Sequence, residues 1–216
     1  MSQVLVVVGG GELSPRAIDL VDDDAIVIAA DSGLDHAVAA GLKPAYLVGD
    51  LDSLSAAGRM WAYAHHVEID EHPPAKDLTD TELALALAVT MQPVVDGHGD
   101  LLVLGGLGDR LDHLLAVLLA LGYPALAAAA SVRALVGDTE VLVLHAGHSL
   151  LPDVEPGELF SVLALHGPCR GVNVRNAEWE LIDADLAPTE ARGISNVARE
   201  ALMIAVDDGV LTVVLP

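Results

Sequence analysis

Short apolar runs that stop at glycine or aspartate constrain the fold of this chain more than any other feature. The runs are Val4 to Val8, Ala25 to Ala30 and Leu101 to Leu104, and the next residue in each case is glycine or aspartate. Continuous apolar runs of this kind are typical of parallel strands that are buried on both faces of a sheet. The first half of the chain is therefore predicted to form a sheet with loops at the carboxyl ends of its strands.

Helices are predicted in the segments that connect these strands. Pro15 to Val21 is the first helix and Leu34 to Ala40 is the second. Thr79 to Glu82 has the spacing of a capping box and opens an Ala/Leu-rich helix, and a further helix ends at Leu121. Alternating strands, loops and helices predict a mostly parallel α/β sheet with helices on its faces.

The pattern changes after about residue 135, where short β-branched or alternating runs are separated by turn residues. Asp207-Asp208-Gly209 predicts a hairpin turn between the last two strands. The predicted architecture is an α/β domain at residues 1–136 and a smaller all-β domain at residues 137–216. The predicted strands of the second domain are Val141 to Leu144, Leu159 to Leu165, Val172 to Val174, Trp179 to Ile182, Leu202 to Val206 and Val210 to Leu215.

Charge and cysteine content narrow the class of partner and the compartment. The chain has 32 acidic and 10 basic residues, a net charge of -22, so nucleic acid is not expected as a partner. Cys169 is the single cysteine, which favours a reducing compartment. The first residues lack the features of a secretory signal, and Gly122-Tyr123-Pro124 interrupts the one long uncharged stretch. A cytoplasmic protein with no membrane partner is expected.

Aspartates follow the predicted strands or open the helices after them. They are Asp31, Asp50, Asp52, Asp77, Asp80 and Asp112. Because ligands bind outside the carboxyl ends of parallel strands, these side chains are expected to meet at one edge. Two carboxylates about 4 Å apart repel by roughly 4 kcal/mol at an effective dielectric of about 20, so the group needs protonation or a metal. Oxygen ligands without Cys or His favour magnesium held jointly with substrate phosphates.

Each of these patterns also has a purely structural explanation. Asp50 and Asp52 would point to the same side of an extended backbone, but they also fit a solvated turn. Asp77 and Asp80 face the same way at a helix start, where acids also complement the helix dipole. Trp179 lies in a predicted strand, where an aromatic residue commonly fills the core. The three glycines after the first strand allow close approach of a phosphate, although glycine after a strand is common.

Taken together and in order, the motifs resemble those of thiamine pyrophosphokinases across nearly the whole chain. The matching segments are Ala30-Asp31-Ser32-Gly33, Gly49-Asp50-Leu51-Asp52-Ser53, Lys76-Asp77-Leu78-Thr79-Asp80, Gly105 through Arg110-Leu111-Asp112-His113, Trp179-Glu180-Leu181 and Arg192-Gly193-Ile194-Ser195-Asn196. The resemblance implies an N-terminal α/β domain that binds ATP and magnesium and a C-terminal β-sandwich that contributes to a thiamine pocket. It also implies a homodimer in which two subunits build each site.

The resemblance further assigns roles to single residues. It implies that Asp50, Asp52 and Asp80 are catalytic and that these three and Asp77 hold magnesium. The residues that it implies for ATP and its phosphates are Asp31, Ser32, Gly33, Ser53, Lys76, Asp77, Thr79, Arg110, Asp112 and His113. The residues that it implies for thiamine are Trp179, Ser195 and Asn196. An indole face suits the cationic thiazolium, since a cation-π contact contributes about 0.5 to 2 kcal/mol.

One residue departs from the family pattern, because Asp109 stands where many relatives have a second glycine before the arginine. The expected reaction is attack of the thiamine hydroxyl on the β-phosphorus of ATP, with release of AMP. Two other functions remain open at this point. One is a sensor that binds thiamine or its diphosphate without turnover, and the other is a magnesium-dependent nucleotide hydrolase in which water replaces thiamine.

Overall fold

The computed structural model describes residues 2–105, 108 and 110–216, and the chain forms two compact units. The first unit is Met1–Asp138 and the second is Thr139–Pro216. The boundary lies two residues beyond the predicted one. Asp109 lies outside the described residues, so its place beside the phosphate loop stays an expectation.

The first unit is built on a parallel sheet. Its strands are β1 (Gln3–Val7), β2 (Ile26–Ala30), β3 (Tyr46–Gly49), β4 (Glu68–Glu71), β5 (Asp100–Leu104) and β6 (Ser131–Val136). They are ordered β6-β5-β1-β2-β3-β4, and every pair in this series is parallel. The predicted parallel α/β architecture is confirmed for this part of the chain.

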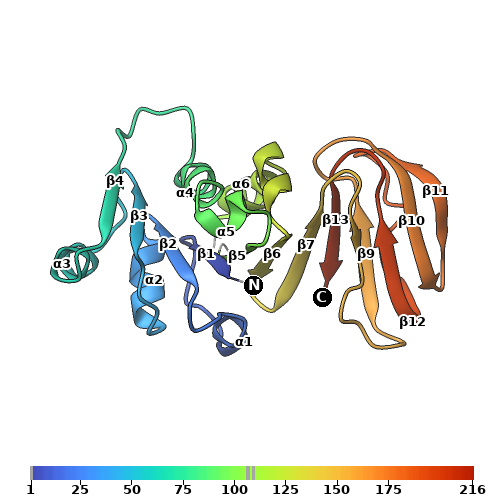
Figure 1. The fold of residues 1–216 in the computed structure, drawn as a ribbon, viewed down its shortest axis with the longest axis horizontal. Coiled ribbons are helices and arrows are strands. Elements are labelled where there is room, and N and C mark those ends of the chain that lie inside the picture. The colour runs from blue at the N-terminus through green and yellow to red at the C-terminus, as the bar shows by residue number, and fades with distance from the viewer. Residues whose placement is uncertain (1, 106–107, 109) are drawn as a thin grey trace. The chain divides into compact units, whose positions relative to one another are not determined.

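Helices cover both faces of this sheet. They are α1 (Pro15–Asp19), α2 (Gly33–Ala39), α3 (Ala56–Ala64), α4 (Asp80–Ala88), α5 (Gln92–Val95), α6 (Leu111–Ala120) and the 3-10 helix η1 (Pro124–Ala128). Figure 1 shows α1 and α2 on one face, and α4, α5 and α6 on the other. Leu5 and Val7 are fully buried against the α1 and α2 face, since they share a core cluster with Ala17 and Ala37.

The strand order places a topological switch between β1 and β5. β1 pairs with β2 on one side and with β5 on the other. The loop after β1 leads to α1 on one face, whereas the loop after β5 leads to α6 on the opposite face (Figure 1). Loops that diverge in this way open a crevice at the carboxyl ends of the strands. Ligands are expected to bind there.

The second unit is an antiparallel β-sandwich. Its strands are β7 (Thr139–Leu144), β8 (Ser149–Leu150), β9 (Leu159–Leu163), β10 (Cys169–Ala177), β11 (Leu181–Leu186), β12 (Asn196–Ala205) and β13 (Leu211–Leu215). The order is β11-β10-β12-β9-β13-β7, and β8 pairs with β12. One apolar cluster takes side chains from β7, β9, β10, β11, β12 and β13, with Phe160 fully buried. The strands therefore fold over a common core, as the resemblance implied.

The hairpin predicted at Asp207-Asp208-Gly209 is wrong. β9 lies between β12 and β13, so the last two strands are not neighbours. The segment instead packs on the start of β10, where Asp208 forms a bridge with Arg170. Gly209 has φ of +95°, and a Cβ there would lie 2.5 Å from the carbonyl oxygen of Pro168. The glycine is thus needed for a close backbone approach as well as for its positive φ.

The strand predicted for Trp179 is also wrong at its first residues. Trp179 lies in the connection between β10 and β11, and its side chain is 60% exposed. The pairing is interrupted because β10 shifts register between Arg175 and Ala177, where Asn176 has φ of +63°. A left-handed residue at a bulge bends the strand, and Trp179 follows three residues later.

The part of the chain that the structure describes contains no helix with the length and hydrophobicity needed to span a bilayer.

Candidate active site

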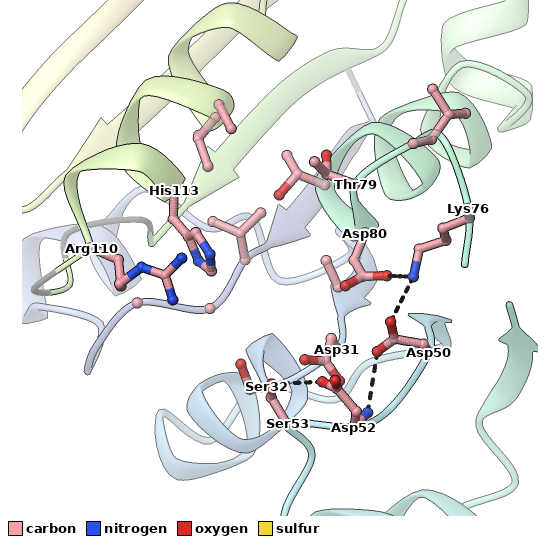
Figure 2. Close-up of a pocket in the computed structure, with 18 of the residues that line it drawn as sticks. Asp31, Ser32, Asp50, Asp52, Ser53, Lys76, Thr79, Asp80, Arg110 and His113 are labelled. Carbon is pink, nitrogen blue, oxygen red and sulfur yellow. Dashed lines mark hydrogen bonds and ion pairs between the residues drawn. The ribbon is translucent and has the colours of Figure 1, made fainter. Parts of the chain in front are cut away.

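A cavity of about 510 Å³ lies at the carboxyl end of the sheet in the first unit. Figure 2 shows the side chains that line it, with the aspartates on one side and Arg110 and His113 on another. The lining residues are Val8, Gly9, Gly10, Ala30, Asp31, Ser32, Asp50, Asp52, Ser53, Pro74, Lys76, Leu78, Thr79, Asp80, Thr81, Arg110, His113, Ala116 and Val117. The loops after β1, β2 and β3 meet here with the starts of α4 and α6 (Figure 2).

Three carboxylates converge in this cavity. Asp31, Asp50 and Asp52 each offer an oxygen atom, and these atoms all lie within 4.8 Å of one another. β2 and β3 bring them together, because Ala30 is in register with Val48 and the strands end side by side. The backbone N–H of Asp31 donates to the carbonyl oxygen of Val48 at 2.9 Å, which fixes where Asp31 leaves the strand.

Asp31 is the most constrained of the three. Its residue is 8% exposed and its φ is +47°, a left-handed conformation that aspartate adopts more readily than most residues. Oδ1 of Asp31 is buried and has no hydrogen-bond partner among the described residues. Burial raises the pKa of Asp31, the backbone N–H of Ser32 opposes that shift, and the charges of Asp80 and Asp52 add to it. A buried carboxylate oxygen that accepts no hydrogen bond is an atom that a bound cation can coordinate.

Asp50 and Asp52 sit in a tight turn directly after β3. Leu51 between them has φ of +61°, and the backbone N–H of Asp52 donates to Oδ1 of Asp50 at 3.3 Å. The hydroxyl of Ser53 donates to Asp52 at 2.8 Å. Arg59 of α3 donates to the carbonyl oxygen of Leu51 at 3.0 Å, which ties the turn to the next helix. The two side chains are therefore held in place before any ligand binds.

Lys76 bridges two of the acids. Its Nζ lies 2.9 Å from Asp50 and 2.9 Å from Asp80, and the lysine and Asp50 side chains are only 13% and 12% exposed. Burial opposes the charge of Lys76, but the hydrogen bonds to Asp80 and Asp50 outweigh it and the pKa of Lys76 is raised. The hydrogen bond from Lys76 in turn lowers the pKa of Asp50. Both groups are charged at neutral pH.

Asp80 is the first residue of α4, and its position depends on Thr79 and Gly49. Thr79 caps the helix through a complete capping box with Glu82, as predicted from the spacing. A Cβ at Gly49 would lie 2.9 Å from Oδ1 of Asp80 and 3.2 Å from the Cβ of Asp31. Because Gly49 also has φ of +144°, glycine is the residue that lets β3 pass this close to both acids.

Arg110 and His113 come from the start of α6 and face the cavity from another side than the acids (Figure 2). Arg110 forms an ion pair with Asp112 at 2.6 Å, and its hydrogen bonds lower the pKa of Asp112 strongly.

Asp112 itself is exposed and does not line the cavity. Asp77 is likewise exposed and outside the lining. Gly33 packs against β1, where a Cβ would lie 2.1 Å from a backbone oxygen.

The lining also includes residues that the sequence did not single out. Pro74 and Leu78 flank Lys76, while Ala116 and Val117 lie on α6 one turn beyond His113. The spacing of three and four residues from His113 places all three α6 side chains on the cavity side of that helix. This spacing was visible in the sequence, but the apolar residues of α6 gave no sign of which face looks into a cavity.

The residues implied for thiamine lie in the second unit. Trp179 is 60% exposed, whereas Asn196 is 3% exposed and directs its side chain at the backbone of Trp179. Ser195 has φ of +57°, and its backbone N–H donates to the hydroxyl of Ser161 at 3.1 Å. The three residues are thus close to one another within the sandwich.

The arrangement in the first unit suits a phosphorylated ligand together with a divalent cation. Carboxylate oxygens gather on one side of the cavity, and an arginine and a histidine stand on another. Hard oxygen ligands of this kind match magnesium, and Arg110 matches phosphate oxygens. Glycines after β1 leave room for the ligand at the switch between β1 and β5.

Two family models match the chain. The model described as thiamin pyrophosphokinase, catalytic domain, matches residues 18–132, and the model described as thiamin pyrophosphokinase, vitamin B1 binding domain, matches residues 147–211. A curated thiamine pyrophosphokinase of Bacillus subtilis is 29% identical over 116 residues, which is 53% of this chain. The match spans about half the length of that relative, 52%.

Solved structures share the fold. A thiamine pyrophosphokinase from Bacillus subtilis superposes with a TM-score of 0.80 at 22% identity, covering 99% of this chain and 98% of that one. A thiamin pyrophosphokinase family protein from Enterococcus faecalis gives a TM-score of 0.76 at 25% identity, covering 99% and 98%. The first of the two family models alone covers residues 18–132, more than half of the 216 residues. The chain belongs to the thiamin pyrophosphokinase family.

Proposed function

We propose that this chain is a thiamine diphosphokinase, which transfers a pyrophosphoryl group from ATP to the hydroxyl of thiamine. One observation carries the proposal: Asp31, Asp50 and Asp52 offer oxygens within 4.8 Å of one another in a cavity that Arg110 and His113 also line. Membership of the family supplies the choice of substrates. The two units take separate roles, with ATP and magnesium at the first unit and thiamine at the second.

Magnesium fits the residues that are present. The buried Oδ1 of Asp31 lacks a donor among the described residues, and the oxygens of Asp50 and Asp52 lie within reach of the same ion. Asp80 lines the same cavity, and Asp77 stands on the loop beside it. When bound, the ion neutralises charge on the ATP phosphates and on the phosphoryl group in transfer.

The residues around the acids position the phosphates. Arg110 and His113 lie where they can hold phosphate oxygens, while Ser32, Ser53 and Thr79 offer hydroxyls at the cavity wall. Lys76 already neutralises Asp50 and Asp80, which lowers the repulsion that an incoming triphosphate meets. Gly33, Asp77 and Asp112 do not line the cavity, so their roles toward ATP are indirect.

The proposed reaction is an in-line displacement. The thiamine oxygen forms a bond to the β-phosphorus, the bond from that phosphorus to the α,β-bridging oxygen breaks, and AMP leaves with the bridging oxygen. A carboxylate of the cavity accepts the hydroxyl proton, and Asp50, Asp52 and Asp80 are the candidates. Trp179 offers its exposed indole to the thiamine rings.

The decisive experiment incubates the protein with thiamine, ATP and magnesium chloride and separates the products. Thiamine diphosphate formed with an equal amount of AMP is the expected result. ADP in place of AMP would mean transfer of a single phosphoryl group. ATP consumption that ignores thiamine would indicate a hydrolase. Thiamine binding in calorimetry without turnover would indicate a sensor, and each of these three outcomes contradicts the proposal.

A homodimer is part of the proposal. On α6, Leu111, Leu115 and Leu119 are 67%, 47% and 55% exposed and lie four residues apart on one face. Three leucines in a row on a helix face are typical of an interface, and a second copy is the proposed occupant. Analytical ultracentrifugation should give a molecular mass of two chains for the wild type, and Leu115→Glu should lower that mass to one chain. A wild-type monomer would contradict this part.

The compartment is proposed to be the cytoplasm. Cys169 is the one cysteine of the chain, and it is buried. A chain without a disulfide suits a reducing environment.

A further inference from the structure

The exposed tryptophan of the second unit stands on a connection that is fastened at several points. Trp179 lies between β10 and β11, and its indole is 60% exposed although the residues beside it are hydrogen-bonded. Exposed connections of this kind usually carry small polar residues, and a large exposed aromatic side chain on one marks a binding surface. The way in which the connection is held therefore bears on its function.

The side chain of Asn196 holds the backbone of Trp179 from both ends. Its Oδ1 accepts from the N–H of Trp179 at 3.1 Å, and its Nδ2 donates to the carbonyl oxygen of the same residue at 2.7 Å. Oδ1 also accepts from the N–H of Val197 at 2.9 Å. Asn196 is 3% exposed. Both polar atoms of the side chain are thus bonded to backbone, and because the residue is buried the second hydrogen on Nδ2 has little access to a ligand.

Other contacts fasten the same connection to β12. The N–H of Glu178 donates to the carbonyl oxygen of Val197 at 2.8 Å, and the Glu178 carboxylate is paired with Arg199. Nδ2 of Asn176 donates to the carbonyl oxygen of Ala201 at 2.7 Å. The connection is therefore bound to β12 at Glu178 and Trp179, and the end of β10 that leads into it is bound to β12 at Asn176.

The pattern at position 196 requires a side chain that both accepts and donates, as an amide does. Two backbone N–H groups need an acceptor, and one backbone carbonyl needs a donor from the same side chain. Ionised aspartate would supply the acceptor but not the donor, and alanine would supply neither. The arrangement of donors and acceptors also fixes which end of the amide is oxygen.

We infer that Asn196 is a positioning residue, which holds Trp179 in place for the aromatic cation that this unit binds and does not itself contact that ligand. The inference rests on the proposed function, since the ligand in question is thiamine. It departs from the role implied by family resemblance, in which Asn196 lines the pocket. A platform that is ordered beforehand loses less conformational freedom when a flat ligand stacks on it.

The test measures the motion of Trp179 without any ligand. Trp61→Phe leaves Trp179 as the one tryptophan, because the chain has two. In that background, Asn196→Ala is expected to add a large fast component to the fluorescence anisotropy decay. Asn173→Ala is the matched control, because Asn173 bridges the carbonyl oxygen of Gly171 and the N–H of Asp183 in the same sandwich. The control should leave the decay unchanged.

Kinetics provide the second readout. With Asn196→Ala, the KM for thiamine should rise about tenfold, the effect of losing roughly one net hydrogen bond, while kcat stays within about twofold. Asn173→Ala should change neither. An unchanged decay overturns the inference, and so does a faster decay with an unchanged KM. If the wild type neither binds nor converts thiamine, the proposed function fails while the anisotropy still decides whether Asn196 positions Trp179.

Asn196→Asp keeps the inference testable if Asn196→Ala does not fold. The ionised carboxylate can still accept from the N–H of Trp179 but cannot donate to its carbonyl oxygen. A protonated carboxyl can donate again, so the anisotropy of this variant should recover as the pH is lowered, and that of the wild type should not change in parallel. A variant whose decay matches the wild type at every pH would overturn the inference.

Discussion

The two units hold their candidate binding residues by different means. In the first unit, charged side chains at the ends of parallel strands are placed against one another, as in the bridge from Lys76 to Asp50 and Asp80. In the second, an exposed indole is held by neutral hydrogen bonds from Asn196. The acids repel one another, and a bound cation would offset that repulsion, whereas the tryptophan is uncharged and is held through its backbone. Changes in the first unit should therefore alter turnover, and changes in the second should alter binding.

The largest expected effect is on the acid group. Asp52→Asn keeps the size of the side chain but removes its charge from the proposed magnesium site. We expect kcat to fall by at least about a hundredfold, the scale for loss of one group that stabilises developing charge, with an unchanged melting temperature. Product formation and circular dichroism measure the two. Asp70→Asn, on exposed β4, is the control, and a wild-type rate for Asp52→Asn would remove this residue from the mechanism.

Trp179→Ala should act on binding with a smaller effect. Loss of a stacked indole is expected to raise the KM for thiamine by about tenfold, which corresponds to about 1.4 kcal/mol. The KM for ATP should not change, because Trp179 belongs to the second unit and the cavity of the acids to the first. Steady-state kinetics with each substrate varied in turn measure both. A fall in kcat with an unchanged KM for thiamine would contradict the assignment of thiamine binding to the second unit and turnover to the first.

Asp31→Asn should raise stability while lowering activity. Burial raises the pKa of Asp31, so the folded state binds its proton more tightly than the unfolded state does. Its contribution therefore becomes less favourable as the pH rises from the ordinary value of 3.8 through the raised value. Without magnesium, the variant should unfold at higher denaturant than the wild type at pH 7, by about 1 kcal/mol, and the difference should vanish below pH 4.

Asparagine suits this position because it tolerates the positive φ of residue 31. Added magnesium should stabilise the wild type and have less effect on the variant, since ligands that bind only the folded state raise its stability. Equal stabilisation of both proteins would exclude Asp31 from the proposed magnesium site.

The smallest expected effect concerns His145 in the second unit. Burial lowers its pKa, and His148 and His166 nearby lower it further. The unfolded state then binds the proton more readily, so stability should be lost as the pH falls below the ordinary value of 6.5. His145→Gln should flatten the slope of unfolding free energy between about pH 6.5 and 5. His98 is exposed, so His98→Gln should leave this slope unchanged. If His145→Gln also left the slope unchanged, His145 would not be the group that causes the loss of stability.

The sequence predicted the first unit better than the second, for a physical reason. Apolar runs buried on both faces define parallel strands, and the carboxyl ends of such strands must lie at one edge. That rule placed Asp31, Asp50, Asp52 and Asp80 at one cavity. It failed to separate Asp77 and Asp112, which are exposed, because Asp77 lies three residues before α4 and Asp112 is the second residue of α6, and neither position fixes where the side chain points.

Elements without an apolar pattern could not be predicted. β4 has the sequence Glu-Ile-Asp-Glu and is an exposed edge strand, so it lacks the alternation of apolar and polar side chains that predicts a strand. Trp179 was placed in a strand because the sequence pattern did not show the bulge at Asn176, which has φ of +63° and donates from its side chain to Ala201 of β12. The strand order of the sandwich, in which β9 lies between β12 and β13, likewise depends on long-range packing rather than on local turn residues.

Gly49 sets a limit on how the first unit can change. A Cβ added at this position would lie 3.2 Å from the Cβ of Asp31 and 2.9 Å from Oδ1 of Asp80. A larger residue there would crowd both acids and would be strained at the positive φ of residue 49. The spacing of the acids at the proposed magnesium site thus depends on the absence of a side chain at residue 49.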